Sequence, residues 1–195
     1  MSIVGLDLAA VETRPTGFCL LKGMAVKTDL FFTDKEIIEQ TLLNSPKLVA
    51  IDAPLYLPPG RTSLDDTRGP HLRESDRELL RIGIKIFPAT LGPMRKLTVR
   101  GMRLRSVFEA EALKVIEAYP GGAQDVLGIP RKGKGIHKLL AGLQTLGIEG
   151  LNIAMSDHEL DAVTCAYVGK LFLEKKADIY GNPNEGIVLP KKENR

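Results

Sequence analysis

The stretches Ile3-Val4-Gly5-Leu6-Asp7 and Leu48-Val49-Ala50-Ile51-Asp52 decide the fold of this chain. Each is an apolar run that ends in an aspartate, which is typical of a buried strand carrying an acid to its end. The second run is apolar up to its last residue, which favours a central strand parallel to the first. Two such strands side by side would bring Asp7 and Asp52 to the same edge of a sheet.

The remaining pattern predicts further strands and helices around these two. The first strand extends over 2–9, and other strand-like stretches lie at 17–21, 25–32 and 114–119, the last stopped by Pro120-Gly121-Gly122. Helical spacing or caps mark segments at 33–43, 72–82, about 93–113, 135–146 and from Ser156 onward. Residues 180–190 have the composition of a Gly/Asn/Pro tail with one apolar run, at 187–189.

This order predicts a single α/β domain over residues 1–195. Three hairpin-linked strands precede a crossover helix and a buried strand, so we expect a five-stranded mixed sheet of order 3-2-1-4-5. Helices should cover both faces. The segment at about 59–113 is longer than a simple crossover needs, and we expect it to form a helical cap inserted after the fourth strand.

The composition is that of a globular protein, with 44% hydrophobic and 26% charged residues. Cys19 and Cys165 lie in apolar runs without paired spacing, which favours reduced core cysteines in a cytoplasmic protein over a disulfide. The N-terminus lacks the features of a signal peptide, and no apolar run approaches the length of a membrane span.

The net charge of +3 is unevenly distributed. The segment from Pro59 to Arg105 has eleven Lys and Arg residues against five Asp and Glu, and the rest of the chain has an acidic excess. A basic segment beside an acidic site suits a polyanion such as nucleic acid. Basic segments are common, however, and charge alone equally fits a solvated helix face with local ion pairs.

Two further aspartates open the helix that follows Ser156. Asp157 and Asp161 are four residues apart and therefore lie on one helix face. Asp has a poor propensity for a helix interior, which favours a functional role for Asp161. Asp157 could simply favour the helix N-terminus electrostatically. His158 could face the same cleft as a ligand or proton carrier, or it could be an ordinary surface histidine.

Carboxylates gathered from strand ends and a helix are what Mg²⁺ or Mn²⁺ requires. We therefore expect Asp7, Asp52 and Asp161 to be the metal ligands and catalytic acids, with Asp157 and His158 in supporting roles. The alternative for Asp7 and Asp52, at the two strand ends, is that each is an ordinary turn aspartate.

Three residues outside this set are further candidates. Glu117 lies near the end of the 114–119 strand and could be a supporting acid. Arg73 and Arg77 share one helical turn and could bind phosphate, for which a planar guanidinium is well suited. A local salt bridge is the alternative for both arginines.

Six motifs in order resemble the family called domain of unknown function 429, predicted nucleases of RNase H-like fold. They are Gly5-Leu6-Asp7-Leu8-Ala9, Ile51-Asp52-Ala53-Pro54-Leu55, Arg73-Glu74-Ser75-Asp76-Arg77, Glu117-Ala118-Tyr119-Pro120, His158-Glu159-Leu160-Asp161-Ala162 and Gly186-Ile187-Val188-Leu189-Pro190. The acids at strands one and four and on the last helix are also distantly similar to RuvC-type resolvases. The resemblance implies the RNase H-like fold and, because those resolvases work as dimers, a homodimer.

Three function classes are compatible with this pattern. The first is a metal-dependent nuclease that hydrolyses the phosphodiester bonds of DNA or RNA with Mg²⁺ or Mn²⁺. The second is a nucleotide-binding actin-like ATPase-type domain, although Leu8-Ala9-Ala10 lacks the glycines that let a backbone approach phosphates. The third is a non-catalytic adaptor on an RNase H-like scaffold.

Overall fold

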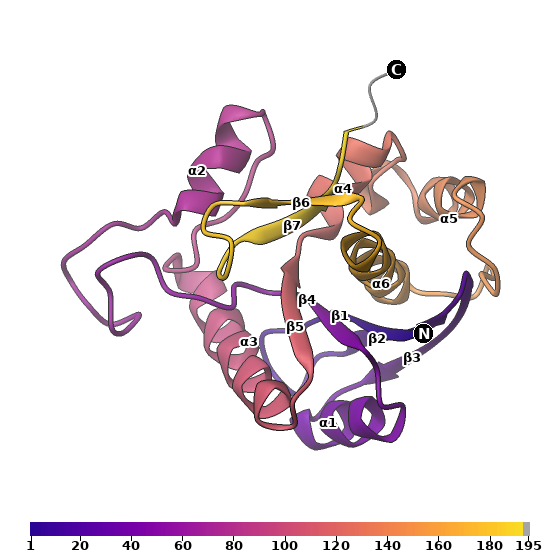
Figure 1. Ribbon diagram of the computed structural model, residues 1–195, viewed down its shortest axis with the longest axis horizontal. Helices are drawn as coiled ribbons and strands as arrows, with labels where there is room; N and C mark the ends of the chain where they lie inside the picture. Colours follow the sequence, from indigo (N-terminus) through magenta and orange to yellow (C-terminus); the bar gives the residue numbers. More distant parts are fainter. Residues whose placement is uncertain (193–195) are drawn as a thin grey trace.

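A computed structural model describes residues 1–192 of the chain. It contains a mixed sheet of seven strands in the order β3-β2-β1-β4-β5-β7-β6 (Figure 1). The strands are β1 (Ser2–Asp7), β2 (Thr16–Lys22), β3 (Ala25–Phe31), β4 (Leu48–Asp52), β5 (Lys114–Ala118), β6 (Ala177–Tyr180) and β7 (Ile187–Pro190). The predicted order 3-2-1-4-5 is therefore confirmed, with two more strands beyond β5.

Strand pairing follows the predicted directions. β1 is antiparallel to β2 and parallel to β4, and β4 is in turn parallel to β5. The expectation of a C-terminal tail at 180–190 is wrong, because β7 pairs in parallel with β5 and β6 pairs antiparallel to β7. The pairing buries the apolar run Ile187-Val188-Leu189, whereas β6 is too short and polar to be recognised from its pattern.

Helices cover both faces of the sheet (Figure 1). They are α1 (Asp34–Leu43), α2 (Glu74–Arg81), α3 (Gly92–Ala110), α4 (Pro120–Leu127), α5 (Ile136–Thr145) and α6 (Asp157–Leu173), with a 3₁₀ turn, η1, at Lys132–Lys134. Thr33 and Ser156 both begin their helices with a capping box, in which the helix's third residue is a glutamate. No helix within residues 1–192 is long and apolar enough to cross a membrane.

Two apolar cores lie on opposite faces of the central strands. One contains Leu104 and Phe108 of α3 and Ile37 of α1, packed on Leu6 and Ile51. The other contains residues of α4, α5 and α6, together with the buried and unpaired Cys19 and Cys165. Successive side chains of the central strands point alternately into one core and the other, with the period of two expected for a strand.

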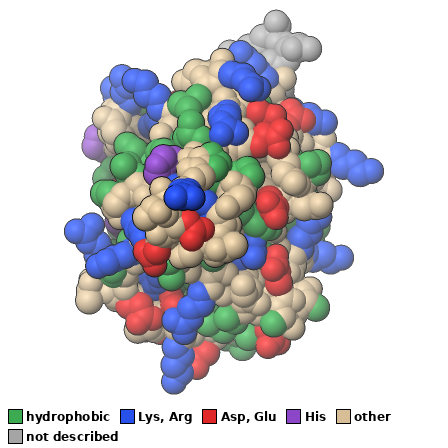
Figure 2. All heavy atoms as spheres, turned by 90° about the vertical axis from the view of Figure 1, so that its left-hand side faces the viewer, with side chains coloured by type: hydrophobic (Ala, Val, Ile, Leu, Met, Phe, Trp, Pro, Cys, Tyr) green, Lys and Arg blue, Asp and Glu red, His purple; other side chains and the backbone are tan. Residues whose placement is uncertain are grey.

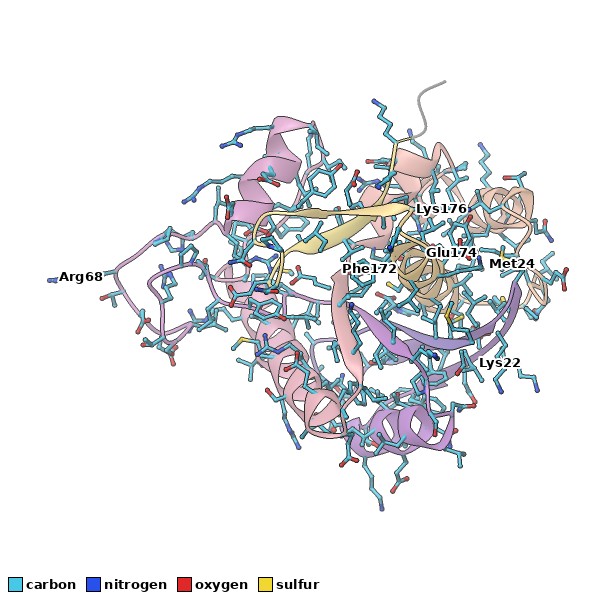
Figure 3. All side chains as sticks on the ribbon, viewed as in Figure 1. Lys22, Met24, Arg68, Phe172, Glu174 and Lys176 are labelled. Carbon is cyan, nitrogen blue, oxygen red and sulfur yellow. The ribbon has the colours of Figure 1, made fainter. Side chains whose placement is uncertain are left out.

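The long segment after β4 has two different destinations. α2 packs against β6, whereas α3 returns along the sheet as the crossover helix to β5, with Leu104 and Phe108 fully buried. Between β4 and α2 the chain forms a loop on which the side chain of Arg68 projects away from the rest of the molecule (Figure 3). The predicted insertion therefore includes a helix, α3, that belongs to the main core.

One helix was missed by the sequence analysis. Pro120-Gly121-Gly122 was expected only to stop the preceding strand, but it forms the first turn of α4. Proline is well suited to the first turn because it has a fixed φ and no N–H to satisfy. A Cβ atom on Gly122 would lie 2.7 Å from the ring of Tyr119, so the close packing of this turn requires a glycine there.

Candidate active site

The carboxylates of Asp7 and Asp52 come from the ends of adjacent parallel strands. The two residues are paired in the register of β1 and β4. Ile3, Leu48 and Ala50 pack in the core that α6 covers, whereas Val4, Leu6, Val49 and Ile51 pack in the opposite core. Because side chains alternate between the two faces along a strand, Asp7 and Asp52 point to the α6 face. The sheet therefore brings the two aspartates together on the α6 side, as predicted.

Two glycines allow α6 to lie directly on the sheet. A Cβ atom on Gly5 would be 2.1 Å from the carbonyl oxygen of Ala162, and one on Gly17 would be 2.0 Å from that of His158. Any side chain at either position would push the helix away. This close approach positions the N-terminal turns of α6 over the Asp7 end of β1.

His158 contacts Asp7 directly. Its Nδ1 lies 2.6 Å from Oδ2 of Asp7. The hydrogen bond with Asp7 is the main cause that raises the pKa of His158, and burial opposes it. A protonated His158 is therefore favoured, and it would hold the Asp7 carboxylate as an ion pair.

Asp161 is buried and has two partners on its carboxylate. Nζ of Lys132 lies 2.8 Å from one oxygen, and Nε2 of Gln124 donates to the other at 2.8 Å. Lys132 also lies 3.4 Å from Asp157, so one ammonium bridges the two aspartates on this face of α6. Burial raises the pKa of Asp161, and the hydrogen bond from Lys132 opposes that rise.

Asp52 differs from its neighbours because its carboxylate makes no hydrogen bond or ion pair with any described residue. Burial raises the pKa of Asp52 well above its ordinary value, and the charges of Asp7 and Asp161 raise it further. An ionised Asp52 is thus destabilised by its surroundings, with Lys132 providing only partial compensation. The carboxylate would be stabilised by an additional cation.

Glu117 lies in a different environment from the one expected. It sits one position out of phase with Ile116 and Ala118, so its side chain points to the α3 face. There its oxygens accept from Nη1 and Nη2 of Arg73 at 2.7 and 2.8 Å, and one oxygen also accepts from the backbone N–H of Leu55. Glu117 lines a small hollow together with Asp52, but its buried carboxylate is fully engaged by these donors and supports the chain just after Asp52.

The same contacts correct the expectation for Arg73. Its guanidinium is buried and binds both Asp76 and Glu117. With its donors held by two buried carboxylates, Arg73 is not available to bind phosphate in this arrangement. Arg77, one turn along α2, is exposed and makes no ion pair with a described residue, but it does not line either hollow at Asp52.

A pocket of about 680 Å³ opens beside Asp52 and Asp161. The segment Arg131–Lys134 forms its basic wall, and Gln124 and Tyr119 line it as well. Arg131-Lys132 and Gly133-Lys134-Gly135 are only a weak signal in the sequence, because they lack the spacing of a phosphate-binding loop. Nothing in the sequence indicates that Gln124 belongs to the site, because it lies in α4, a helix that the sequence pattern does not predict.

The donor chemistry around Asp52 fits a hard divalent cation. Mg²⁺ is usually bound through one or two carboxylates, and waters and substrate phosphates complete its shell. Within residues 1–192, no three His, Cys, Asp or Glu side chains are grouped so as to hold one ion. The residues therefore fit a site based on Asp7 and the unpartnered Asp52, with Asp161 bound to Lys132 instead of completing a cluster of three.

No protein-family model and no curated protein matches the chain. The assignment to domain of unknown function 429 thus stays a prediction. Among solved structures, that of RuvC from Thermus thermophilus is similar to this chain, with a TM-score of 0.46 and 15% sequence identity. The match covers 90% of this chain and 96% of that chain.

Proposed function

We propose that this protein is a metal-dependent nuclease that hydrolyses phosphodiester bonds in nucleic acid. The observation that carries the proposal is the Asp52 carboxylate. It is surrounded by the charges of Asp7 and Asp161, opens into a pocket and has no partner of its own among the described residues. An ionised carboxylate in this situation is stabilised by a cation, and without one the acid is stabilised only by taking up a proton.

The residues around Asp52 would have different roles in binding the metal ion. Asp7 and Asp52 would hold Mg²⁺ or Mn²⁺, and Asp161 would supply a third carboxylate from α6 only if the ion displaced Lys132 from it. His158 would orient Asp7 through their hydrogen bond. A bound divalent ion would supply an activated water and stabilise the leaving oxygen.

The basic wall of the pocket would bind the substrate. Lys134 makes no ion pair with a described residue, whereas its neighbours Arg131 and Lys132 are paired with Asp125 and with Asp157 and Asp161. Lys134 would compensate the phosphate charge next to acids that would otherwise repel a polyanion. On the face that carries α2 and α3, Lys and Arg side chains are spread among Asp and Glu (Figure 2).

A thermal-shift screen with Mn²⁺, Mg²⁺, ATP and buffer alone tests the ligand class. A divalent ion at one hundred times its Kd would stabilise the protein by about 2.7 kcal/mol, or about 5–11 °C. ATP should stabilise it only if the nucleotide-binding alternative is correct. Asp52→Asn should remove the response to the metal.

A cleavage assay tests the reaction itself. Labelled single-stranded, duplex and branched DNA and RNA would be incubated with Mn²⁺ or Mg²⁺, with Asp7→Asn and Asp52→Asn as controls. Metal-dependent cleavage that both variants lose is the expected result. Absence of both a metal response and cleavage would leave the adaptor alternative. Light scattering of the same samples would test the predicted homodimer.

A further inference from the structure

An exposed aromatic side chain lies next to the candidate active site. Phe87 is 70% exposed, in the connection between α2 and α3. It lines a small hollow of about 80 Å³ together with Asp52 and Tyr119. By comparison, Phe18 and Phe108 are buried in the core, so Phe87 is not explained by core packing.

Tyr119 connects Phe87 to the basic pocket. Its hydroxyl donates to the carbonyl oxygen of Lys85, two residues before Phe87, at 2.9 Å. On the other side Nη1 of Arg131 donates to the same hydroxyl at 3.3 Å, with the guanidinium 5.7 Å from the ring centre. Tyr119 and Asp52 line both hollows, so the hollow with Phe87 and the pocket with the basic wall adjoin at these two residues.

Two exposed lysines belong to the segments that carry Phe87 and the pocket wall. Lys85, near Phe87, and Lys134, in the pocket wall, are exposed and have no ion pair with a described residue. An exposed aromatic side chain beside a pocket with an unpaired cation is complementary to an unpaired base and its adjoining phosphates. A base within a duplex is already stacked on both faces, so it would gain little from Phe87.

We propose that Phe87 is a stacking platform for an unpaired base of single-stranded nucleic acid whose backbone crosses Asp52 to reach the Arg131–Lys134 wall. The proposal rests on the proposed function, because it assigns the substrate of the same site. It concerns binding alone, so it can be tested with a chelator present and without any cleavage.

The chain has no tryptophan, which makes a single-tryptophan reporter available. Phe87→Trp would be titrated with single-stranded and duplex oligonucleotides in low salt with EDTA. Leu43→Trp is the matched control, since Leu43 is 76% exposed and lies at the end of α1 that leads to the start of β4, at the opposite edge of the sheet from Asp52. We expect saturable quenching by single strands in the Phe87→Trp variant and little quenching in the Leu43→Trp variant.

Affinity measurements separate stacking from other contacts. Phe87→Ala should weaken single-strand binding by about 5- to 150-fold, the range found for loss of one base stack. Phe87→Leu should weaken it similarly, because an apolar group without a ring cannot stack. Lys134→Ala should instead reduce the dependence of log affinity on log salt by about 0.7.

The proposal would be overturned by any of three results. These are unquenched fluorescence of the Phe87→Trp variant in the presence of a bound single strand, unchanged affinity in Phe87→Ala, and full affinity in Phe87→Leu. A change of oligomeric state in Phe87→Ala without loss of binding would assign Phe87 to a protein contact and overturn it as well. If the wild-type protein binds no nucleic acid in EDTA the proposal fails, whereas the metal response of Asp52 tests the proposed function separately.

Discussion

Nη1 of Arg73 lies 2.7 Å from Oε2 of Glu117, in a buried ion pair that joins the start of α2 to β5. The same guanidinium binds Asp76, whose side chain is fully buried. Arg73 therefore compensates two buried carboxylates at once. Removing one partner of such a pair leaves an uncompensated charge in the protein interior.

We predict that Arg73→Ala destabilises the protein by about 3–5 kcal/mol, the usual cost of breaking a buried ion pair. Denaturant unfolding would measure the loss. Arg77→Ala is the control, because Arg77 is exposed and unpaired among described residues, and its cost should be within about 0.5 kcal/mol. Equal effects of the two substitutions would show that the Arg73 ion pairs contribute little.

A second prediction concerns the pH dependence of the contact between His158 and Asp7. The pKa of His158 is raised in the folded protein, mainly by its hydrogen bond with Asp7. Its stabilisation is therefore fully present below the ordinary histidine pKa and is lost as pH rises through the raised value. In EDTA, His158→Ala should lower the melting temperature more at pH 5.5 than at pH 8.5. A larger loss at pH 8.5 would contradict a protonated His158.

A third prediction concerns Lys132. Its ammonium bridges Asp157 and Asp161, so it occupies carboxylates that a divalent ion could use. Lys132→Met should therefore increase the stabilisation that Mn²⁺ provides, measured as the shift in melting temperature. Lys134→Met removes a neighbouring cation that has no ion pair with a described residue, and it should change that shift less. A smaller Mn²⁺ shift in Lys132→Met would mean that Lys132 does not compete with the metal.

The central sheet could be predicted from the sequence because its signal is local. An apolar run ending in aspartate indicates both the strand and the position of its acid, and this was sufficient to place Asp7 beside Asp52. Ser156 likewise indicated the capped start of α6.

The errors arose where the outcome depends on partners distant in sequence. Whether Arg73 binds phosphate or Glu117 depends on a strand that lies 44 residues further along the chain. The sequence does not show which face of the sheet the Glu117 side chain occupies, because the pattern at the end of a strand does not indicate which elements pack against it. β6 is too short to have a reliable pattern, and it forms only because β7 provides a partner.

The last prediction separates stability from function at Asp52. The pKa of Asp52 is raised by burial and by the charges of Asp7 and Asp161, so its ionised form destabilises the folded protein. A carboxylate with a raised pKa reduces stability as pH rises from its unfolded value through its folded value. Without metal, Asp52→Asn should therefore melt higher than the wild type at pH 8, and the gain should shrink as pH falls toward 4.5. The same variant should lose both the Mn²⁺ shift and cleavage, because a neutral amide is a poor ligand for the ion.

Asp34→Asn is the control, since Asp34 is buried in an ion pair with Arg100 and its substitution should destabilise by about 3–5 kcal/mol. If Asp52→Asn instead melted lower at pH 8, its charge would be stabilising the fold; if it kept the Mn²⁺ shift, Asp52 would not be a ligand.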